Sequence, residues 1–273
     1  ARPWVRLMPK HSHIPMVVSL SHPPPKALLG GKGEQITALL QGDLPTPGGL
    51  CIPGQAFDSI LKNSPLAPHL KALKAALRSA NQSQAMAEGV ILRQGILKLP
   101  IPPGLETDLR RRWIALGVKE VAVRSSSAGE DGAMASFAGQ HETHLGVRGW
   151  GKLLTAIRRT WASLFSEGAL SYRLTGRDAL GLRDAGLTMA VLIQPMIRPR
   201  ASGVLFTRNP MTGSRREMAL DAAFGLGEAI VSGEIAADSF LLVVDTGEVV
   251  ALLSPADGHE TNAAGAVFRW ETQ

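Results

Sequence analysis

Apolar residues recur at helical spacing in several segments of the chain. Each of these segments places an apolar stripe on one face, as expected of helices that pack against a core. One predicted helix follows the glycines of "LLGGKGEQITALLQ", with Ile36, Leu39 and Leu40 on its apolar face. The other predicted helices are residues 55–63, 65–80, 106–116 and 150–166.

Apolar runs that suit strands gather in the second half of the chain. Early strands are predicted at 14–20 and 118–124, and "LTMAVLIQPMI" (187–197), "SGVLFTRNP" and "EMALDAAFG" follow. "DSFLLVVDTGEVVALLS" predicts a hairpin that turns at Asp245 to Gly247. This mixture of helices and late strands predicts an α+β or mixed α/β fold.

Length and composition narrow the class of protein. The 273 residues suffice for one large domain or two modest lobes, and 45% of them are hydrophobic. No run of eighteen apolar residues occurs, which argues against a membrane span. Cys51 is the single cysteine, so an intrachain disulfide and a thiolate zinc cluster are excluded, and a reducing, cytoplasmic setting is expected.

The charge balance indicates an anionic partner. The net charge is +6, but the basic residues are scattered and only 5% of residues are aromatic. Nucleic-acid modules usually interleave aromatic with basic residues, which argues against that class. A phosphorylated small molecule fits better.

"GGKG" (Gly30 to Gly33) places a lysine between glycines at the entrance of a predicted helix. Glycines let backbone N–H groups approach an anion, the helix dipole adds positive potential, and Lys32 supplies a mobile charge. The spacing is not that of a Walker A loop. A glycine turn with a solvated lysine remains the alternative.

Arg124 ends an apolar strand and precedes "SSSAGEDGAMASFAGQ". A strand that fixes its base would let the guanidinium reach a phosphate in two-point contact. The small residues after it suit a loop that closes over a polyphosphate. An ordinary surface loop with a salt bridge is the competing interpretation.

Three further motifs carry weaker signals. "IQPMI" could offer backbone groups to an adenine edge at Gln194, with Met196 against the ring, or could be a plain strand end. The pair His141 and His144 in "HETH" lacks a third ligand, so no metal site is predicted there. "GLGEAIVSG" does not have the spacing of a dinucleotide loop.

Together, and in this order, six segments resemble the N-terminal nucleotide-binding domain of the phosphoenolpyruvate synthase and pyruvate phosphate dikinase family, which rifampin phosphotransferase and the glucan dikinases share. The resemblance covers roughly residues 28–244. It implies an ATP-grasp fold, in which two α+β lobes close on ATP. The segments are "LLGGKGEQ", "LPTPGGLCIP", "VAVRSSSAGEDGAMASFAGQHET", "IQPMI", "SGVLFTRNPMTG" and "DAAFGLGEAIVSGEIAADSF".

The resemblance also implies a function. Family enzymes split ATP, pass a phosphoryl group to a histidine on a separate swivelling domain, and then deliver it to an acceptor. Lys32 and Arg124 match the family's phosphate-binding, catalytic positions. Other matching positions are Ser136, Gly139 and Gln140 in the lid, Gln194 and Met196 at the adenine hinge, and Thr207 and Glu228 lining the cleft.

The chain departs from the family pattern in two places. Pro53 and Gly54 stand where the family usually has two threonines. No segment after Phe240 matches the family's magnesium-binding acids, and Glu248, Asp257 and Glu260 lack their spacing. Because magnesium normally bridges the transferred phosphates, we expect this chain to bind ATP weakly at best and to lack catalysis by itself.

The resemblance divides the chain into three parts. Residues 1–27 form an N-terminal extension with a short strand, 28–185 the first lobe, and 186–273 an incomplete second lobe with the adenine hinge. The phosphohistidine domain is expected elsewhere, on another domain or subunit. Two alternatives remain: a nucleotide-binding module without catalysis, and a basic nucleic-acid-binding protein.

Overall fold

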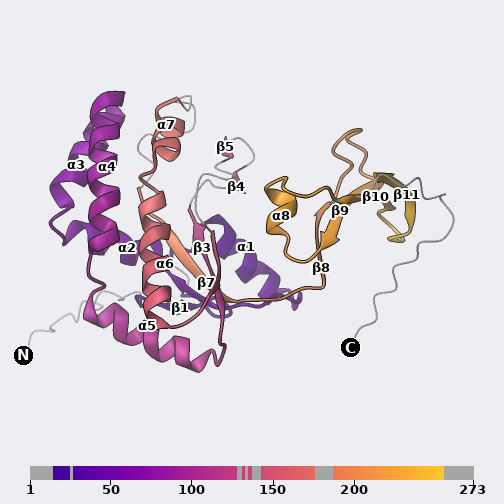
Figure 1. The fold of residues 1–273 in the computed structure, drawn as a ribbon, viewed down its shortest axis with the longest axis horizontal. Coiled ribbons are helices and arrows are strands. Elements are labelled where there is room, and N and C mark those ends of the chain that lie inside the picture. The colour runs from indigo at the N-terminus through magenta and orange to yellow at the C-terminus, as the bar shows by residue number, and fades with distance from the viewer. Residues whose placement is uncertain are drawn as a thin grey trace, which may run out of the picture. The chain divides into compact units, whose positions relative to one another are not determined.

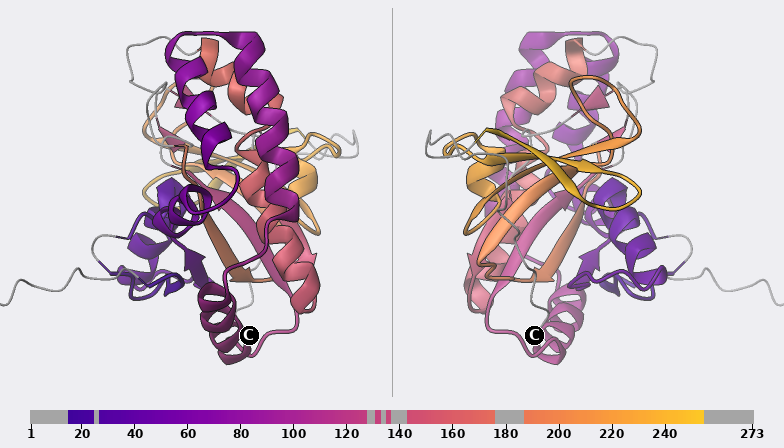
Figure 2. Two further views of the ribbon diagram at one scale, coloured as in Figure 1. Left: turned by 90° about the vertical axis from the view of Figure 1, so that its left-hand side faces the viewer. Right: turned by 90° about the vertical axis from the view of Figure 1, so that its right-hand side faces the viewer.

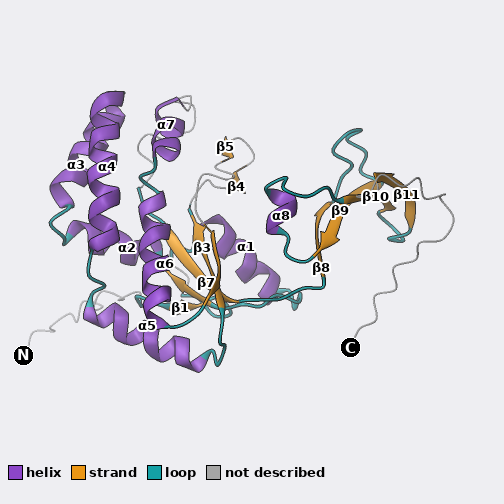
Figure 3. Cartoon of the chain, in the orientation of Figure 1, coloured by secondary structure: helices purple, strands orange, loops and turns teal. Residues whose placement is uncertain are grey.

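The computed structural model describes residues 15–24, 27–127, 131–132, 135–136, 143–175 and 187–254, without the side chains of 131–132, 135–136 and 251–254. The chain divides into two compact units, one ending at Met196 and the other beginning at Ile197. Both contain an antiparallel sheet, so the α+β prediction is confirmed (Figure 3).

The first unit is built on a five-stranded antiparallel sheet with the order β1-β2-β7-β3-β6. Strands far apart in sequence meet at its centre, where β7 lies between β2 and β3. These strands are β1 (Val18–Ser19), β2 (Leu50–Ile52), β3 (Val121–Ser126), β6 (Thr143–Val147) and β7 (Ala190–Pro195).

One face of this sheet carries most of the core (Figure 1). Trp161 and Phe57 are almost entirely buried there, and their rings stack 5.0 Å apart. The sheet residues Val121, Val123 and Ile193 belong to the same cluster. The helices that supply it are α2 (Gly54–Lys62), α3 (Ala67–Arg78), α4 (Gln82–Lys98), α5 (Pro103–Ala115), α6 (Trp150–Ser163) and α7 (Glu167–Thr175).

Among the described residues, one helix, α1 (Gly30–Gln41), covers the opposite face. A small second cluster joins Leu192 of β7 and Cys51 of β2 to Ile36 and Leu40 of α1. The predicted inward position of Leu39 is wrong, because this side chain is 42% exposed. The helix packs so close to the sheet that the small residues Gly33 and Thr37 are its buried positions instead.

The helices predicted at 55–63, 65–80, 106–116 and 150–166 are confirmed as α2, α3, α5 and α6, with shifted ends. Helix α4 was missed. Its buried residues Ala85, Leu92 and Ile96 lie on one face, but Val90 and Ile91 are apolar and exposed, so no single apolar stripe marks the helix in the sequence. Gly89 of this helix lets α7 approach closely, since a Cβ at this position would lie 2.3 Å from the Leu170 side chain.

The boundary between the units differs from the predicted one at 185/186. Strand β7 hydrogen-bonds to β2 on one side and β3 on the other, so it belongs to the sheet of the first unit. The division therefore falls after Met196.

The second unit is a four-stranded antiparallel sheet with the order β11-β10-β9-β8, seen from two sides in Figure 2. The predicted hairpin is confirmed as β10 and β11. Few of its described side chains are buried, chiefly Phe240, Ala219 and Asn209. Its elements are β8 (Ala201–Phe206), β9 (Glu217–Phe224), α8 (Glu228–Val231), β10 (Asp238–Val243) and β11 (Val249–Ser254).

Candidate functional site

The start of α1 is joined directly to the end of β3. The Gly31 N–H donates to the carbonyl oxygen of Ser127 over 3.2 Å, and the Gly33 N–H donates to Ser126 Oγ over 3.0 Å. The glycines therefore belong to the first turn of the helix, and two N–H groups of this turn donate to the last residue of β3 and to the residue after it. Lys32 stands between these two attachments, half-buried.

Gly30 has to be a glycine at this junction. Its φ of +72° lies in the left-handed region, and a Cβ there would lie 2.2 Å from the Ser126 carbonyl oxygen. The glycine-rich motif thus permits contact between two protein segments, and its N–H groups do not all point to an open anion site. That corrects the simplest interpretation of "GGKG".

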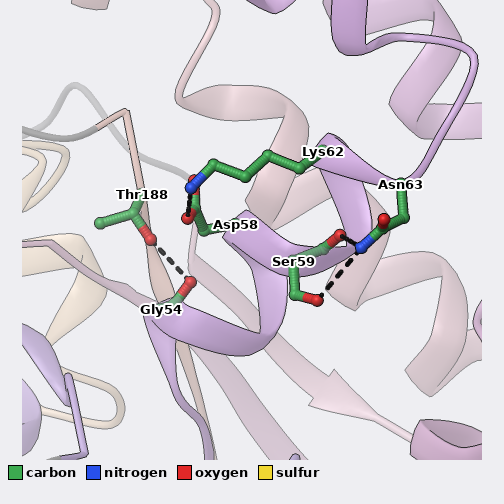
Figure 4. Close-up of polar contacts among 6 residues, drawn as sticks. All are labelled: Gly54, Asp58, Ser59, Lys62, Asn63 and Thr188. Atoms are coloured by element: carbon green, nitrogen blue, oxygen red, sulfur yellow. Dashed lines mark hydrogen bonds and ion pairs between the residues drawn. The ribbon is translucent and has the colours of Figure 1, made fainter.

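The start of α1 is also attached to the start of α2. The Leu28 N–H donates to Gln55 Oε1 over 2.7 Å, and the Gly54 N–H donates to the Leu28 carbonyl over 2.8 Å. Thr188, just before β7, donates its hydroxyl to the Gly54 carbonyl over 2.7 Å (Figure 4). The segment that carries Lys32 is thereby connected to β3, α2 and the segment entering β7.

Gly54, one of the two residues that depart from the family pattern, fits this packing. A Cβ at Gly54 would lie 2.8 Å from Thr188 Oγ1 and 3.6 Å from the Leu28 Cβ. Its neighbour Pro53 occupies the N-cap of α2, in an extended conformation. The glycine that departs from the family pattern therefore lies where α2 and the start of α1 pack closely together.

Arg124 lies on the face of the sheet that α1 covers. It pairs with Leu192, which belongs to the cluster under α1, and it is two residues from Ser126 on β3. Residues two apart on a strand share a face. The Arg124 side chain is half-buried, and its guanidinium forms no ion pair with any residue in the described part of the chain.

The three serines after Arg124 are buried, and the first two belong to β3. Strand β3 extends to Ser126, beyond the predicted end at 124, and Ser125, Ser126 and Ser127 are 2%, 0% and 3% exposed. They are therefore not part of a lid. Polar groups inside proteins are normally hydrogen-bonded, so serine hydroxyl groups can be buried at these positions.

The predicted lid is described only in part. Asp131 and Gly132 form β4, which pairs with β5 at Ala135 and Ser136, and β4 lies against α1. Gly139 and Gln140 lie outside the described residues.

Gln194 and Met196, the predicted adenine hinge, lie at the end of β7. The buried Gln194 side chain donates from Nε2 to the Gly48 carbonyl over 3.1 Å. The Met196 N–H donates to the Glu120 carbonyl over 3.0 Å. These two donors are already used within the protein, which leaves the Met196 side chain, half-buried, as the more accessible part of this segment.

Thr207 and Glu228 belong to the second unit. Thr207 directly follows β8 and Glu228 is the first residue of α8, and both are exposed. The structure thus brings Lys32, Arg124 and Ser126 together in one unit, and places Thr207 and Glu228 in the other.

The metal ligands expected from the family are not assembled within the described residues, where no three His, Cys, Asp or Glu side chains gather as a cation site would require. His144 is half-buried on β6, and His141 lies outside the described residues. Burial raises the pKa of the Cys51 thiol above its ordinary range, so it stays protonated and unreactive.

A hollow on the described surface lies at the far end of α1 from Lys32. Its volume is about 580 Å³. The C-terminal end of a helix carries the negative end of its dipole, and Asp43 adds a negative charge. This hollow is therefore unsuited to a phosphate. It is lined by Ser21, His22, Pro23, Leu40, Gln41 and Asp43.

Comparison with known proteins shows the family of this chain. Residues 26–261 match the family described as pyruvate phosphate dikinase, AMP/ATP-binding domain. The chain belongs to that family. The match includes Lys32 and Arg124 and extends over most of the second unit.

Several curated relatives share this domain. The chain is 39% identical over 227 residues to a rifampicin phosphotransferase of Streptomyces sp, covering 82% of this chain and 26% of the relative. It is 33% identical to the phosphoenolpyruvate synthase of Aeropyrum pernix, covering 79% and 27%. It is 36% identical to the prodigiosin synthesizing transferase PigC of Serratia marcescens, covering 81% and 23%. The chain therefore spans about a quarter of these relatives.

No helix among the described residues is long and apolar enough to cross a membrane.

Proposed function

We propose that this pyruvate phosphate dikinase-type domain binds ATP for a phosphotransferase, and that its phosphoryl group passes to a histidine on a separate domain or subunit. The observation that carries the proposal is the junction of α1 with β3. It brings the segment of Lys32 to the strand end that carries Arg124.

Two cations, one on the sheet face that α1 covers and one in the first turn of α1, suit a triphosphate. Arg124 offers a planar, permanently charged guanidinium on a rigid strand, and Lys32 offers a compact ammonium at the start of a helix. Phosphoryl transfer depends mainly on positioning and on electrostatic stabilisation of phosphate oxygens. Both requirements are met best by side chains whose backbones are held, as these are.

The remaining predicted residues are assigned to the nucleotide in the same proposal. Met196 packs against the adenine, with Gln194 holding the end of β7 in place through Gly48. The lid residues Ser136, Gly139 and Gln140 exclude water. Thr207 and Glu228 contribute from the second unit, and we expect their share to be smaller because both are solvated.

Magnesium would neutralise the charge of the transferred phosphates when it is bound with ATP. The described residues do not assemble a metal site, so we assign none of them to the ion. The histidine and the final acceptor belong to the larger protein in this proposal, because the relatives extend well beyond this domain.

Calorimetry with ATP, with and without magnesium, tests the proposal. We expect weak binding by the wild-type chain and a loss of at least about tenfold in Lys32→Ala, since a charge-assisted contact is lost. Lys62→Ala is the matched control, because Lys62 is an exposed lysine that pairs with Asp58 at 2.5 Å on α2 (Figure 4).

Two outcomes would contradict the proposal. Equal ATP affinity of Lys32→Ala, Lys62→Ala and wild type would remove Lys32 from the phosphate site. Tight, magnesium-dependent binding or turnover by this chain alone would show that the catalytic parts are not supplied elsewhere.

A further inference from the structure

Ser126 occupies a special position in the first unit. It is the last residue of β3, its side chain is 0% exposed, and its Oγ accepts a hydrogen bond from the Gly33 N–H, 93 residues away in sequence. The next residue, Ser127, accepts from the Gly31 N–H through its carbonyl. The last residue of β3 and the residue after it thus accept from the N–H groups on either side of Lys32.

The same residue determines how closely the helix approaches the strand. A Cβ on Gly30 would lie 2.2 Å from the Ser126 carbonyl oxygen and 2.5 Å from its Oγ, and a Cβ on Gly33 would lie 3.6 Å from that Oγ. Ser126 is therefore in contact with both ends of "GGKG". A larger or apolar side chain at this position would separate or release the helix start.

Ser126 also shares a strand face with Arg124, because the two residues are two positions apart on β3. A displacement of the α1 start relative to β3 changes the position of Lys32 with respect to Arg124.

We infer that Ser126 is a positioning residue, which holds Lys32 in register with Arg124 so that both cations meet the same polyphosphate. The inference rests on the proposed function. Ser126 does not itself touch the nucleotide: its oxygen is buried and occupied by the Gly33 N–H.

Ser126→Ala tests this by calorimetry with ATP. The substitution removes the acceptor and leaves the buried Gly33 N–H without a partner, and we expect an ATP affinity about five- to tenfold lower. Ser163→Ala is the matched control: Ser163 is a buried serine of α6, 3% exposed, whose hydroxyl donates to the Thr160 carbonyl over 2.8 Å. It removes a comparable hydrogen bond without affecting the α1 junction, so its ATP affinity should equal that of wild type.

A double-mutant cycle separates positioning from a general loss of structure. If Ser126 acts through Lys32, Ser126→Ala in a Lys32→Ala background lowers the ATP affinity by less than about twofold. A purely structural defect would lower the affinity by the same factor in both backgrounds. Ser126→Cys, whose thiol is somewhat larger and accepts hydrogen bonds weakly, replaces Ser126→Ala if the alanine variant does not fold.

The outcomes distinguish the inference from the proposal beneath it. Wild-type chain that does not bind ATP overturns both. ATP binding that Lys32→Ala weakens but Ser126→Ala leaves unchanged overturns the positioning role alone. Equal losses in Ser126→Ala and Ser163→Ala, or independent effects of Ser126 and Lys32, also overturn it.

Discussion

The two units of this chain are built on antiparallel sheets but bury their side chains very differently. In the first unit, both faces of the sheet are covered, and Phe57, Trp161 and Ile193 are at most 1% exposed. In the second unit, Phe240 is the largest buried side chain described and is still 9% exposed, while Phe224 is 73% exposed. Burial of apolar area is the main stabilising contribution to a fold, so the first unit should be the more stable one.

This difference explains where the proposed cations reside. Lys32 and Arg124 stand on a helix and a strand that hydrogen bonds and packing hold from several sides. Thr207 and Glu228 are exposed residues of the second unit. Groups that bind a phosphate precisely need supports that do not move, because misplacement weakens each contact.

The largest expected difference between the units concerns core truncation. Phe57→Ala removes a stacked, buried ring from the first unit and should lower the free energy of unfolding by about 3–5 kcal/mol. Phe240→Ala should lower it by roughly 1–3 kcal/mol, because its surroundings are less enclosed. Urea denaturation with hydrogen exchange, which reports each unit separately, measures both. Equal losses would contradict the comparison.

Next in size is a pair of glycines with the same φ of +72°, Gly30 and Gly213. Gly30→Ala combines backbone strain with a collision against the Ser126 carbonyl, and we expect a loss of about 3 kcal/mol or more. Gly213→Ala has nothing within 4 Å of the added methyl group, so only about 1–2 kcal/mol of strain is expected. Thermal unfolding of the two variants compares them; similar shifts would mean that the α1 junction is not tight.

A smaller effect is expected for ATP binding. Arg124→Ala should weaken ATP binding by about 2–3 kcal/mol. Glu228→Gln, in the second unit, should change it by less than about 1 kcal/mol. Arg111→Ala is the arginine control, since Arg111 is exposed and pairs with Asp108 at 2.6 Å. A Glu228→Gln effect as large as that of Arg124→Ala would move the main binding determinant to the second unit.

The smallest expected change is none. Cys51 lies under α1 at 0% exposure, and burial raises the pKa of its thiol, so the thiolate does not form as the pH rises from 7 to 9. A thiol reagent should leave Cys51 unmodified in the folded protein and label it after denaturation. Rapid labelling of the native chain would show that α1 leaves the sheet readily.

The periodicity predicted α2, α3, α5 and α6, because each has one face toward the core and one toward water. It failed for α4, because the exposed apolar residues Val90, Ile91 and Leu97 obscure its single buried face. It also failed for Leu39 on α1, because the backbone of this helix lies so close to the sheet that glycine and threonine fill the contact. Side-chain patterns report the direction of burial but not how closely two elements approach.

For the candidate site, Lys32 and Arg124 could be named from motifs and from the family resemblance. The role of the three serines after Arg124 could not, because small polar residues are equally typical of a loop and of a close backbone junction. The sequence also did not reveal that the Gln194 side-chain amide and the Met196 N–H are hydrogen-bonded within the protein, since their partners Gly48 and Glu120 are far away in sequence.

The sequence by itself determined the α+β class, the family and the residue types available for a phosphate. Composition, periodicity and short motifs are local properties, and the chain carries them in any conformation. Only the tertiary structure decided that β7 lies between β2 and β3 and that the "GGKG" segment packs against Ser126. It also decided that Arg124 lies on the face of the sheet that α1 covers. These are contacts between segments many residues apart, and they arise only when the chain packs.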